Sequence, residues 1–554
     1  MPSSEGRKRS RRACETCREL KRKCDGAEPC GTCVRFEYDC AYSKAASGRR
    51  SRKATDVATA SSPATQISLP SPLVETGQAI QNSNSRIRSL EANSGAAFLR
   101  RLALRIDANN APRMHTFAWN SFLGKRTAGY TPVSRLICEI LSEREMKSLA
   151  DVYYEKLDPV YGFVDRGGID KLISNRWTYS QTVRPEDAVL CGIAALGYLF
   201  SQVQAGSLEL DLAESARSVL ERSMFEPPTA TSITAWVLRV VYLRLTETPH
   251  IVWMASCMLM HMIEAAGLQY ECAQGSILHP CPQTVNPEIR KRLVAVAQHL
   301  NTWVSFDMGR SRVTPGNVTD GTLSAPLGDR TVEIAELLPY SIILDPERAS
   351  NVSELESALA SVLQRVHSSP PSILAQVNLM LCLCRRLQSM NIAFQGSTLD
   401  QVLSLSSRGI QAAQDLLEER TPWHHMVNVP FHVVCVLLAI DTLSSTPQLR
   451  HAMHCLNSVA AVYKTEATQE ALRTASLLIS LHQKWKEKCA ANLSDVLRMC
   501  PITSNIETQD GSSQLLNDAN WLDGILGDLS TIQQFDLDRL LTPAPPWETD
   551  VNSV

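Results

Sequence analysis

The sequence predicts a small irregular cysteine-rich module followed by a large all-α helical domain, with a disordered linker between them and an acidic C-terminal tail. Six cysteines fall within residues 14–40, where hydrophobic residues are scarce, and helical spacing of apolar residues recurs from about residue 98 to 500. A chain of 554 residues can hold several folding units and a large core. We expect boundaries at 1–44, 45–97, 98–500 and 501–554.

The charge of the chain is unevenly distributed. Residues 1–53 hold 15 lysines and arginines against 7 acidic residues, whereas the remaining residues hold 40 against 50. A basic head of this kind favours a polyanionic partner. The first residues, MPSSEGRKRSRRAC, lack the apolar stretch of a signal peptide, and no apolar run reaches the ~20 residues that span a bilayer. We therefore expect a soluble intracellular protein with reduced thiols and no membrane partner.

The cysteine spacing is C-x2-C-x6-C-x5-C-x2-C-x6-C, formed by Cys14, Cys17, Cys24, Cys30, Cys33 and Cys40. Zn²⁺ takes four thiolates in a tetrahedron, so six sulfurs can serve two ions only if two of them bridge both. The count predicts a cofactor of two Zn²⁺ that replaces a hydrophobic core and drives folding. Three disulfides would also use six cysteines, but they need an oxidising compartment, and a redox pair would need a strand–helix unit.

A basic run, CRELKRKC, links the second and third cysteines. Lysine and arginine match the O6 and N7 acceptors of guanine, and positive charge near phosphates releases counterions. The run therefore predicts double-stranded DNA as the partner, although such charge runs elsewhere are usually solvated faces.

All six cysteines, Pro29 and this basic run resemble the fungal zinc binuclear cluster transcription factors. The resemblance implies a module with two short helices in which Cys14 and Cys30 bridge the metals. One zinc would then take Cys17 and Cys24, and the other Cys33 and Cys40.

The same resemblance implies that the module reads CGG-like half-sites in the major groove. Lys21 takes the position of the base-reading lysine, and Arg18, Arg22 and Lys23 would hold phosphates or adjoining bases. Glu19 and Leu20 depart from positions that are often basic in the family. The patches RKRSRR and GRRSRK also resemble a split nuclear import signal, so we expect a nuclear protein.

Residues 45–97 are rich in Ser, Thr, Ala and Pro and predict a linker. Ile80, Ile87 and Leu90 fit a coiled-coil seam, but Ser83, Ser94 and the following glycine end it before three heptads. A homodimer is thus implied by the family alone, and monomeric binding stays open.

The body contains long segments with helical periodicity, among them residues 186–203, 234–245, 250–268 and 288–309. Small residues in the first, such as Gly192 and Gly197, would let partner helices approach closely. The segments YYEKLDPVYGFVDR, MIEAAGLQYE and EIRKRLVAVAQHLNTWVSFDMGRSRVTP resemble the family's middle homology region, and Gly309 is expected to end a helix.

No catalytic motif is present among the nucleophile elbow, phosphate loop, dinucleotide and zinc-protease patterns, so we predict that the chain is not an enzyme. His424, His425 and His432 could suggest a metal site, but adjacent helical histidines diverge, and we interpret them as core or surface residues. Cys382 and Cys384 are interpreted as core thiols. The alternative is a ligand-sensing or enzymatic helical body tethered to DNA by the cluster.

The last fifty residues contain nine acidic residues and one arginine. One helical face would carry Trp521, Leu522, Ile525, Leu526 and Leu529. This pattern resembles an acidic activation segment that orders on a coactivator, while a helix docked on the body is the alternative. Together these features predict a sequence-specific regulator, and an activator, of RNA polymerase II genes. The element AFLRRLALRIDANNAPRMHTFAWN resembles regulators of secondary-metabolite clusters of the polyketide type.

Overall fold

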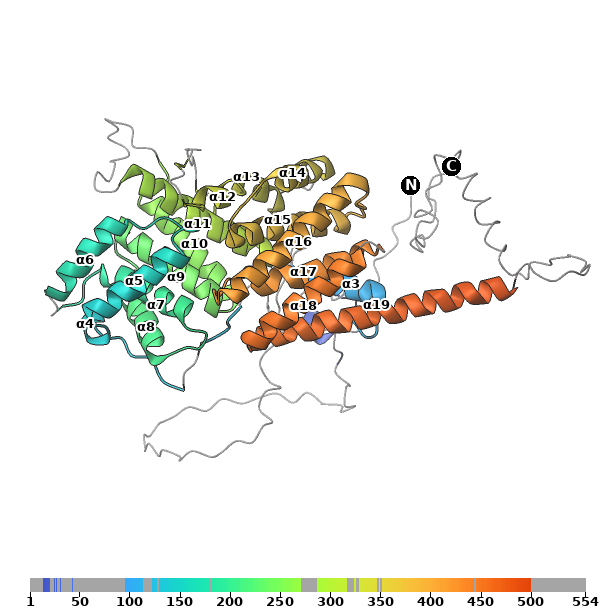
Figure 1. Cartoon of the computed structure of the whole chain (residues 1–554), viewed down its shortest axis with the longest axis horizontal. Coiled ribbons are helices and arrows are strands. Elements are labelled where there is room, and N and C mark those ends of the chain that lie inside the picture. The colour runs from blue at the N-terminus through green and yellow to red at the C-terminus, as the bar shows by residue number, and fades with distance from the viewer. Residues whose placement is uncertain are drawn as a thin grey trace, which may run out of the picture. The chain divides into compact units, whose positions relative to one another are not determined.

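The computed structural model describes residues 95–499 apart from 113–121, 127–128, 179–181, 271–285, 316–322, 325–327, 346–347, 349–350 and 443–444. Before them it describes residues 13–19, 24, 26, 30 and 42. The predicted coiled-coil residues of the linker and the acidic tail lie outside this part of the chain. Every regular element of the described residues is a helix, which confirms the predicted all-α class (Figure 1).

Local sequence signals explain where several helices begin. Helix α5 (Glu143–Lys156) starts with a capping box, in which the Ser142 hydroxyl accepts from the Glu145 amide at 3.3 Å and the Glu145 carboxylate accepts from the Ser142 amide at 2.8 Å. Helices α10 (Pro249–Ala265) and α11 (Pro287–Met308) begin with proline, whose missing N–H is not needed in the first turn. Helices α10 and α11 begin within one residue of the segments 250–268 and 288–309 that periodicity predicted.

The first half of the body is built around α7 (Asp187–Ser201), which is buried along most of its length. Helices α5, α8 (Ser207–Arg222) and α9 (Ala230–Thr246) pack on it, and α10 and α11 continue the array from α9. Shorter or peripheral helices complete this half: α4 (Ile137–Ile140), α6 (Arg166–Thr178), α12 (Thr331–Ala335), α13 (Leu338–Ser341) and the 3-10 helix η2 (Ile342–Leu344).

The second half is a bundle in which α15 (Pro370–Ser389) and α17 (His425–Ile440) are the buried helices. Around them pack α14 (Val352–Gln364), α16 (Gly396–Glu418) and α18 (Thr446–Val462), drawn in gold and orange (Figure 1). The first helix of the body, α3 (Gly95–Ile106), contacts α15 and α17 rather than the helices that follow it in sequence. The two halves share one continuous hydrophobic core.

The last helix, α19 (Glu466–Met499), has 34 residues. Its first part buries Ala471, Ala475 and Leu478, whereas its last described residues, from Cys489 to Met499, belong to a second unit. Among the described helices, none combines the length and the continuous apolar character that crossing a bilayer requires.

Candidate metal centre and nucleic-acid interface

Four of the six predicted metal ligands come together at the N-terminal end of the chain. The Sγ atoms of Cys14, Cys17, Cys24 and Cys30 all lie within 4.8 Å of one another. Cys30 Sγ is 3.8 Å from Cys14 Sγ and 3.6 Å from Cys17 Sγ. Four thiolates bound to Zn²⁺ at about 2.3 Å form a tetrahedron with edges of about 3.8 Å. The spacing of the sulfurs therefore fits one zinc ion.

A short helix sets two of these ligands. Helix α1 (Glu15–Glu19) starts directly after Cys14, so that the Cys17 amide points back and donates to Cys14 Sγ at 3.4 Å. An amide that donates to a thiolate stabilises its charge and fixes the direction of its lone pairs. The residues Cys14, Cys17 and Cys30 are almost completely buried, and the hydrophobic side chains that pack against them among the described residues are Cys24 and Tyr42.

Gly26 and Tyr42 support Cys24, and sequence reasoning missed both. Gly26 has φ 84°, a left-handed conformation that only glycine adopts without strain, and it turns the chain after Cys24. The Tyr42 hydroxyl lies 3.5 Å from Cys24 Sγ, and this hydrogen bond lowers the pKa of the thiol. A lowered pKa favours the thiolate that a metal ion requires. The glycine two residues after the third cysteine was the signal that could have revealed the turn.

The structure places one of the four predicted DNA contacts. Arg18 lies on α1 with its side chain exposed, and its guanidinium donates to the Ala13 carbonyl at 3.2 Å. Because Arg18 directly follows Cys17, its positive charge lies next to the metal centre. Lys21, Arg22 and Lys23 lie outside the described residues, as do Cys33 and Cys40.

The histidine and cysteine residues considered in the body are part of its interior. His424, His425 and His432 are at most 4% exposed, and Cys382 and Cys384 are buried in α15. The rings of His424 and His425 are closer than expected, with centroids 4.2 Å apart, because His424 precedes α17 instead of lying within it. Within the described residues, the four cysteines of the N-terminal module are the one group arranged to hold a metal.

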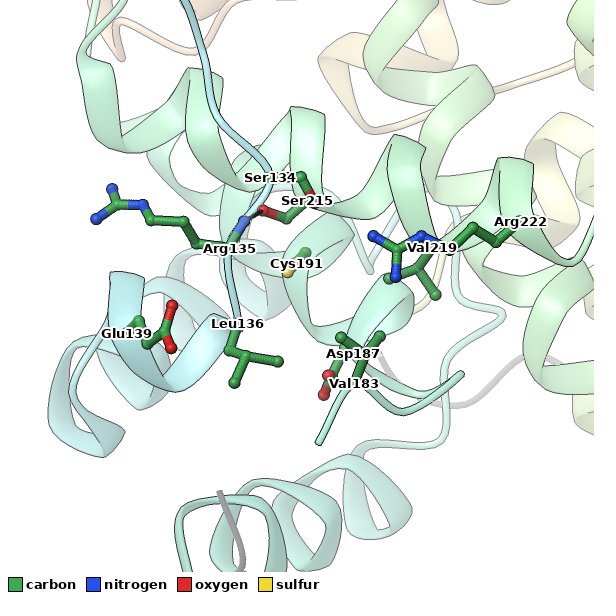
Figure 2. A pocket seen from close by; sticks show the side chains of 10 residues that line it. All are labelled: Ser134, Arg135, Leu136, Glu139, Val183, Asp187, Cys191, Ser215, Val219 and Arg222. Atoms are coloured by element: carbon green, nitrogen blue, oxygen red, sulfur yellow. Dashed lines mark hydrogen bonds between the residues drawn. The ribbon is translucent and has the colours of Figure 1, made fainter. Parts of the chain in front are cut away.

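A pocket of about 230 Å³ opens between α4, α7 and α8 (Figure 2). Two polar groups of its lining make hydrogen bonds within the protein: Ser215 accepts from the Arg135 amide at 3.0 Å, and Asp187 accepts from Arg176 at 2.6 Å. Burial raises the pKa of the Cys191 thiol far above its usual range, so this sulfur is not a nucleophile. The pocket lining therefore contains no activated catalytic group.

Comparison with known proteins agrees with the geometry. Residues 12–49 match the fungal Zn(2)-Cys(6) binuclear cluster domain, and residues 150–434 match the fungal specific transcription factor domain. Protein RDR1 of Gibberella zeae is 54% identical over 546 residues, which cover 98% of this chain and 99% of that protein. Transcription factor kojR of Aspergillus oryzae is 36% identical, with 96% and 94% covered. Protein RDR1 of Saccharomyces cerevisiae is 31% identical, with 91% and 94% covered.

The fold and the cysteine centre define a zinc-dependent DNA-binding protein with a large helical body. The chain belongs to the family of fungal Zn(2)-Cys(6) transcription factors. Its cofactor is the pair of zinc ions of the binuclear cluster, and it is a transcription factor, not an enzyme. These findings confirm the family, the cofactor and the absence of catalysis that the sequence predicted.

Proposed function

We propose that this protein is a nuclear, sequence-specific regulator that binds CGG-type triplets in the major groove. The observation that carries the proposal is the close spacing of the sulfurs of Cys14, Cys17, Cys24 and Cys30 next to an exposed Arg18. These four cysteines are the set expected for one zinc, and Cys33 and Cys40 would complete the second with Cys14 and Cys30 as bridges. The metal centre would then hold the basic run CRELKRKC rigid against DNA.

Each basic residue has a role that can be separated by experiment. Lys21 would donate to guanine O6 and N7, whereas Arg18, Arg22 and Lys23 would contact phosphates or adjoining bases. Loss of a base contact weakens specific binding by about 1–3 kcal/mol, or about 5- to 150-fold. Loss of a phosphate contact weakens binding to all sequences and lowers the salt slope by about 1.

The test uses the full chain and fluorescence anisotropy with a duplex that contains CGG triplets and a duplex with a scrambled sequence. Lys21→Ala should reduce binding to the first duplex and leave binding to the second almost unchanged. Lys125→Ala removes the same charge from an exposed site in the body and serves as the matched control. Equal affinity of the wild type for both duplexes would contradict the proposed recognition of CGG.

We infer that the protein activates transcription through its tail. Support comes from the sequence pattern, in which Trp521, Leu522, Ile525, Leu526 and Leu529 interrupt an acidic segment. Replacing these five residues with alanine should lower expression of a reporter driven by the protein's binding sites without changing DNA affinity. A rise in reporter expression would instead indicate a repressor. The variant with the five alanines should also lose the binding of coactivators to the tail.

Two further parts of the proposal come from the family. The protein would bind paired half-sites as a homodimer, which analytical ultracentrifugation of the full chain, alone and with DNA, can decide. Its targets would lie in a secondary-metabolite gene cluster of the polyketide type. A genome-wide map of its binding sites tests this proposal directly, because a pathway-specific regulator should occupy promoters within one cluster.

A further inference from the structure

A buried arginine without hydrogen-bond partners lies at the centre of the helical body. Arg244 on α9 is 2% exposed, and among the described residues no acceptor lies within hydrogen-bond distance of its Nε, Nη1 or Nη2 atom. The carboxylate that faces it is Asp307 of α11, at 3.8 Å between Nη2 and Oδ2. Asp307 also accepts a hydrogen bond from Asn378 Nδ2 at 3.4 Å, so its carboxylate interacts with both Arg244 and Asn378.

The groups around Arg244 are mostly aromatic rings with polar nitrogens: a neutral imidazole has one donor and one acceptor nitrogen, and an indole has one donor. His299 and Trp303 lie on α11 with ring centroids 4.6 Å apart, and His425 at the start of α17 lies 5.8 Å from Trp303. His424 stacks between His425 and Trp423, with centroids 4.2 and 4.9 Å away. Within the described part of the chain, these side chains leave nitrogens without partners: His299 Nδ1 and Nε2, Trp303 Nε1, Trp423 Nε1, His424 Nε2, and His425 Nδ1 and Nε2.

The charge balance of the cluster is positive. Arg385 on α15 is also 2% exposed; it donates to Cys382 Sγ at 3.0 Å, and its Nε and Nη1 atoms have no acceptor among the described residues. Asp307 is the one carboxylate of the described residues that faces both Arg244 and Arg385. Burial and the charge of Arg244 lower the pKa of His299, His424 and His425, so these rings are neutral at pH 7. Two guanidinium groups thus face a single carboxylate.

The excess of positive charge restricts the kind of molecule that could bind beside Arg244 and Arg385. A buried guanidinium without an acceptor is strongly destabilising, because its hydration is lost and nothing replaces it. A cation or an apolar molecule would not remove that penalty. Water could accept hydrogen bonds, but it would leave the excess positive charge uncompensated. A carboxylate supplies both the acceptors and the charge, and it pairs with guanidinium through two parallel hydrogen bonds.

We propose that Arg244, Arg385 and the surrounding imidazole and indole N–H groups form a buried binding site for a small organic carboxylate. The site joins α9 and α11 of the first half of the body to α15 and α17 of the second half (Figure 1). A bound carboxylate would therefore stabilise the packing of the two halves against each other. Because all of its groups are buried, the helices must separate locally for the ligand to enter, and binding should be slow. The inference does not rest on the proposed DNA recognition.

The first test locates an anion directly. Crystals of the full chain are soaked in sodium bromide, and anomalous diffraction is measured at the bromine edge. A bromide peak in contact with the Arg244 guanidinium supports an anion site. Ordered water in the same position, with no anomalous signal, would overturn the proposal.

The second test asks whether the anion is a carboxylate. Thermal unfolding of the full chain is followed with increasing sodium acetate or sodium benzoate at constant ionic strength, because a ligand of the folded state raises the midpoint with the logarithm of its concentration. The midpoint should rise for the wild type and for Arg239→Gln, a half-buried arginine on the same helix, but not for Arg244→Gln. If Arg244→Gln does not fold, Arg244→Lys should fold with a weaker response. A bromide peak without any response to either carboxylate would refute a carboxylate site.

Discussion

A close approach of helices α5 and α7 makes Gly197→Ala a demanding test of the fold. A Cβ atom at Gly197 on α7 would overlap the backbone carbonyl oxygen of Leu149 on α5, and it would lie 2.8 Å from the carbonyl carbon and 3.1 Å from Cα of the same residue. These are backbone atoms, so no change of rotamer relieves the overlap. The two helices must move apart.

The expected effect follows from two opposing terms. Alanine favours the interior of a helix by about 1 kcal/mol relative to glycine. Overpacking typically costs about 1–3 kcal/mol and exceeds this range where the backbone itself has to shift. We therefore expect Gly197→Ala to lower the free energy of unfolding by about 2 kcal/mol. Urea unfolding of the full chain, followed by far-ultraviolet circular dichroism, measures the change.

Gly192 on the same helix provides the matched control. A Cβ atom there would meet the Leu238 side chain, with Cβ at 3.1 Å and Cδ1 at 3.3 Å, so the neighbour has to shift by only a few tenths of an ångström. Gly192→Ala should therefore stay within about 1 kcal/mol of the wild type, since its helix propensity offsets the mild crowding. A Gly197→Ala variant as stable as the wild type would show that α5 and α7 do not cross as described.

Three further perturbations test other parts of the structure. Arg176→Met should lower the free energy of unfolding by about 3–5 kcal/mol, because the buried Asp187 carboxylate loses the guanidinium that donates to it at 2.6 and 3.0 Å. The double variant Arg176→Met with Asp187→Leu should recover most of this loss in the same urea assay. Acid should destabilise the body as the pH falls below about 6.5. The lowered pKa of His299, His424 and His425 keeps these rings neutral in the folded state, whereas the same histidines take up protons in the unfolded chain. The free energy of unfolding should therefore fall by up to about 1.4 kcal/mol per histidine for each pH unit. Replacing the three with phenylalanine should flatten urea midpoints measured between pH 5 and 7, and an unchanged slope would refute this origin. Removal of zinc with a chelator should abolish DNA binding measured by anisotropy and leave the main unfolding transition of the body unchanged. The reason is that the metal-binding group of the described residues lies in the N-terminal module. Loss of the body's helical signal on chelation would contradict this separation.

Features encoded by neighbouring residues could be predicted from the sequence. The segment 186–203 is observed as α7 from Asp187 to Ser201, and Gly309 caps α11 as predicted, in a left-handed conformation with φ of 63°. The Arg310 amide then donates to the Ser305 carbonyl at 2.8 Å, which closes the helix end. The spacing of Cys14 and Cys17 could likewise be interpreted from the sequence, because a single helical turn places both cysteines.

Features that depend on packing between distant segments could not be predicted. Arg244, Asp307, Arg385 and the histidines at 299, 424 and 425 are separated by up to 181 positions, and each looks like an ordinary member of an amphipathic helix. Their meeting depends on how the two halves of the body pack, and no local periodicity encodes that arrangement. The sequence indicated that His424 and His425 were core or surface residues, but not that they lie around a charged group.

The position of α3 has a consequence for how the chain is made. This helix leaves the ribosome first among the helices of the body, yet its partners are α15 and α17, which end at Ser389 and Ile440. At about 5–20 residues per second, the ribosome needs on the order of 20–70 s to synthesise the intervening chain. During that interval Phe98, Leu99 and Leu102, which are buried in the finished protein, have nowhere to dock. Nascent chains of this protein should therefore engage chaperones early, and variants that expose α3 should aggregate during synthesis more than they do after refolding.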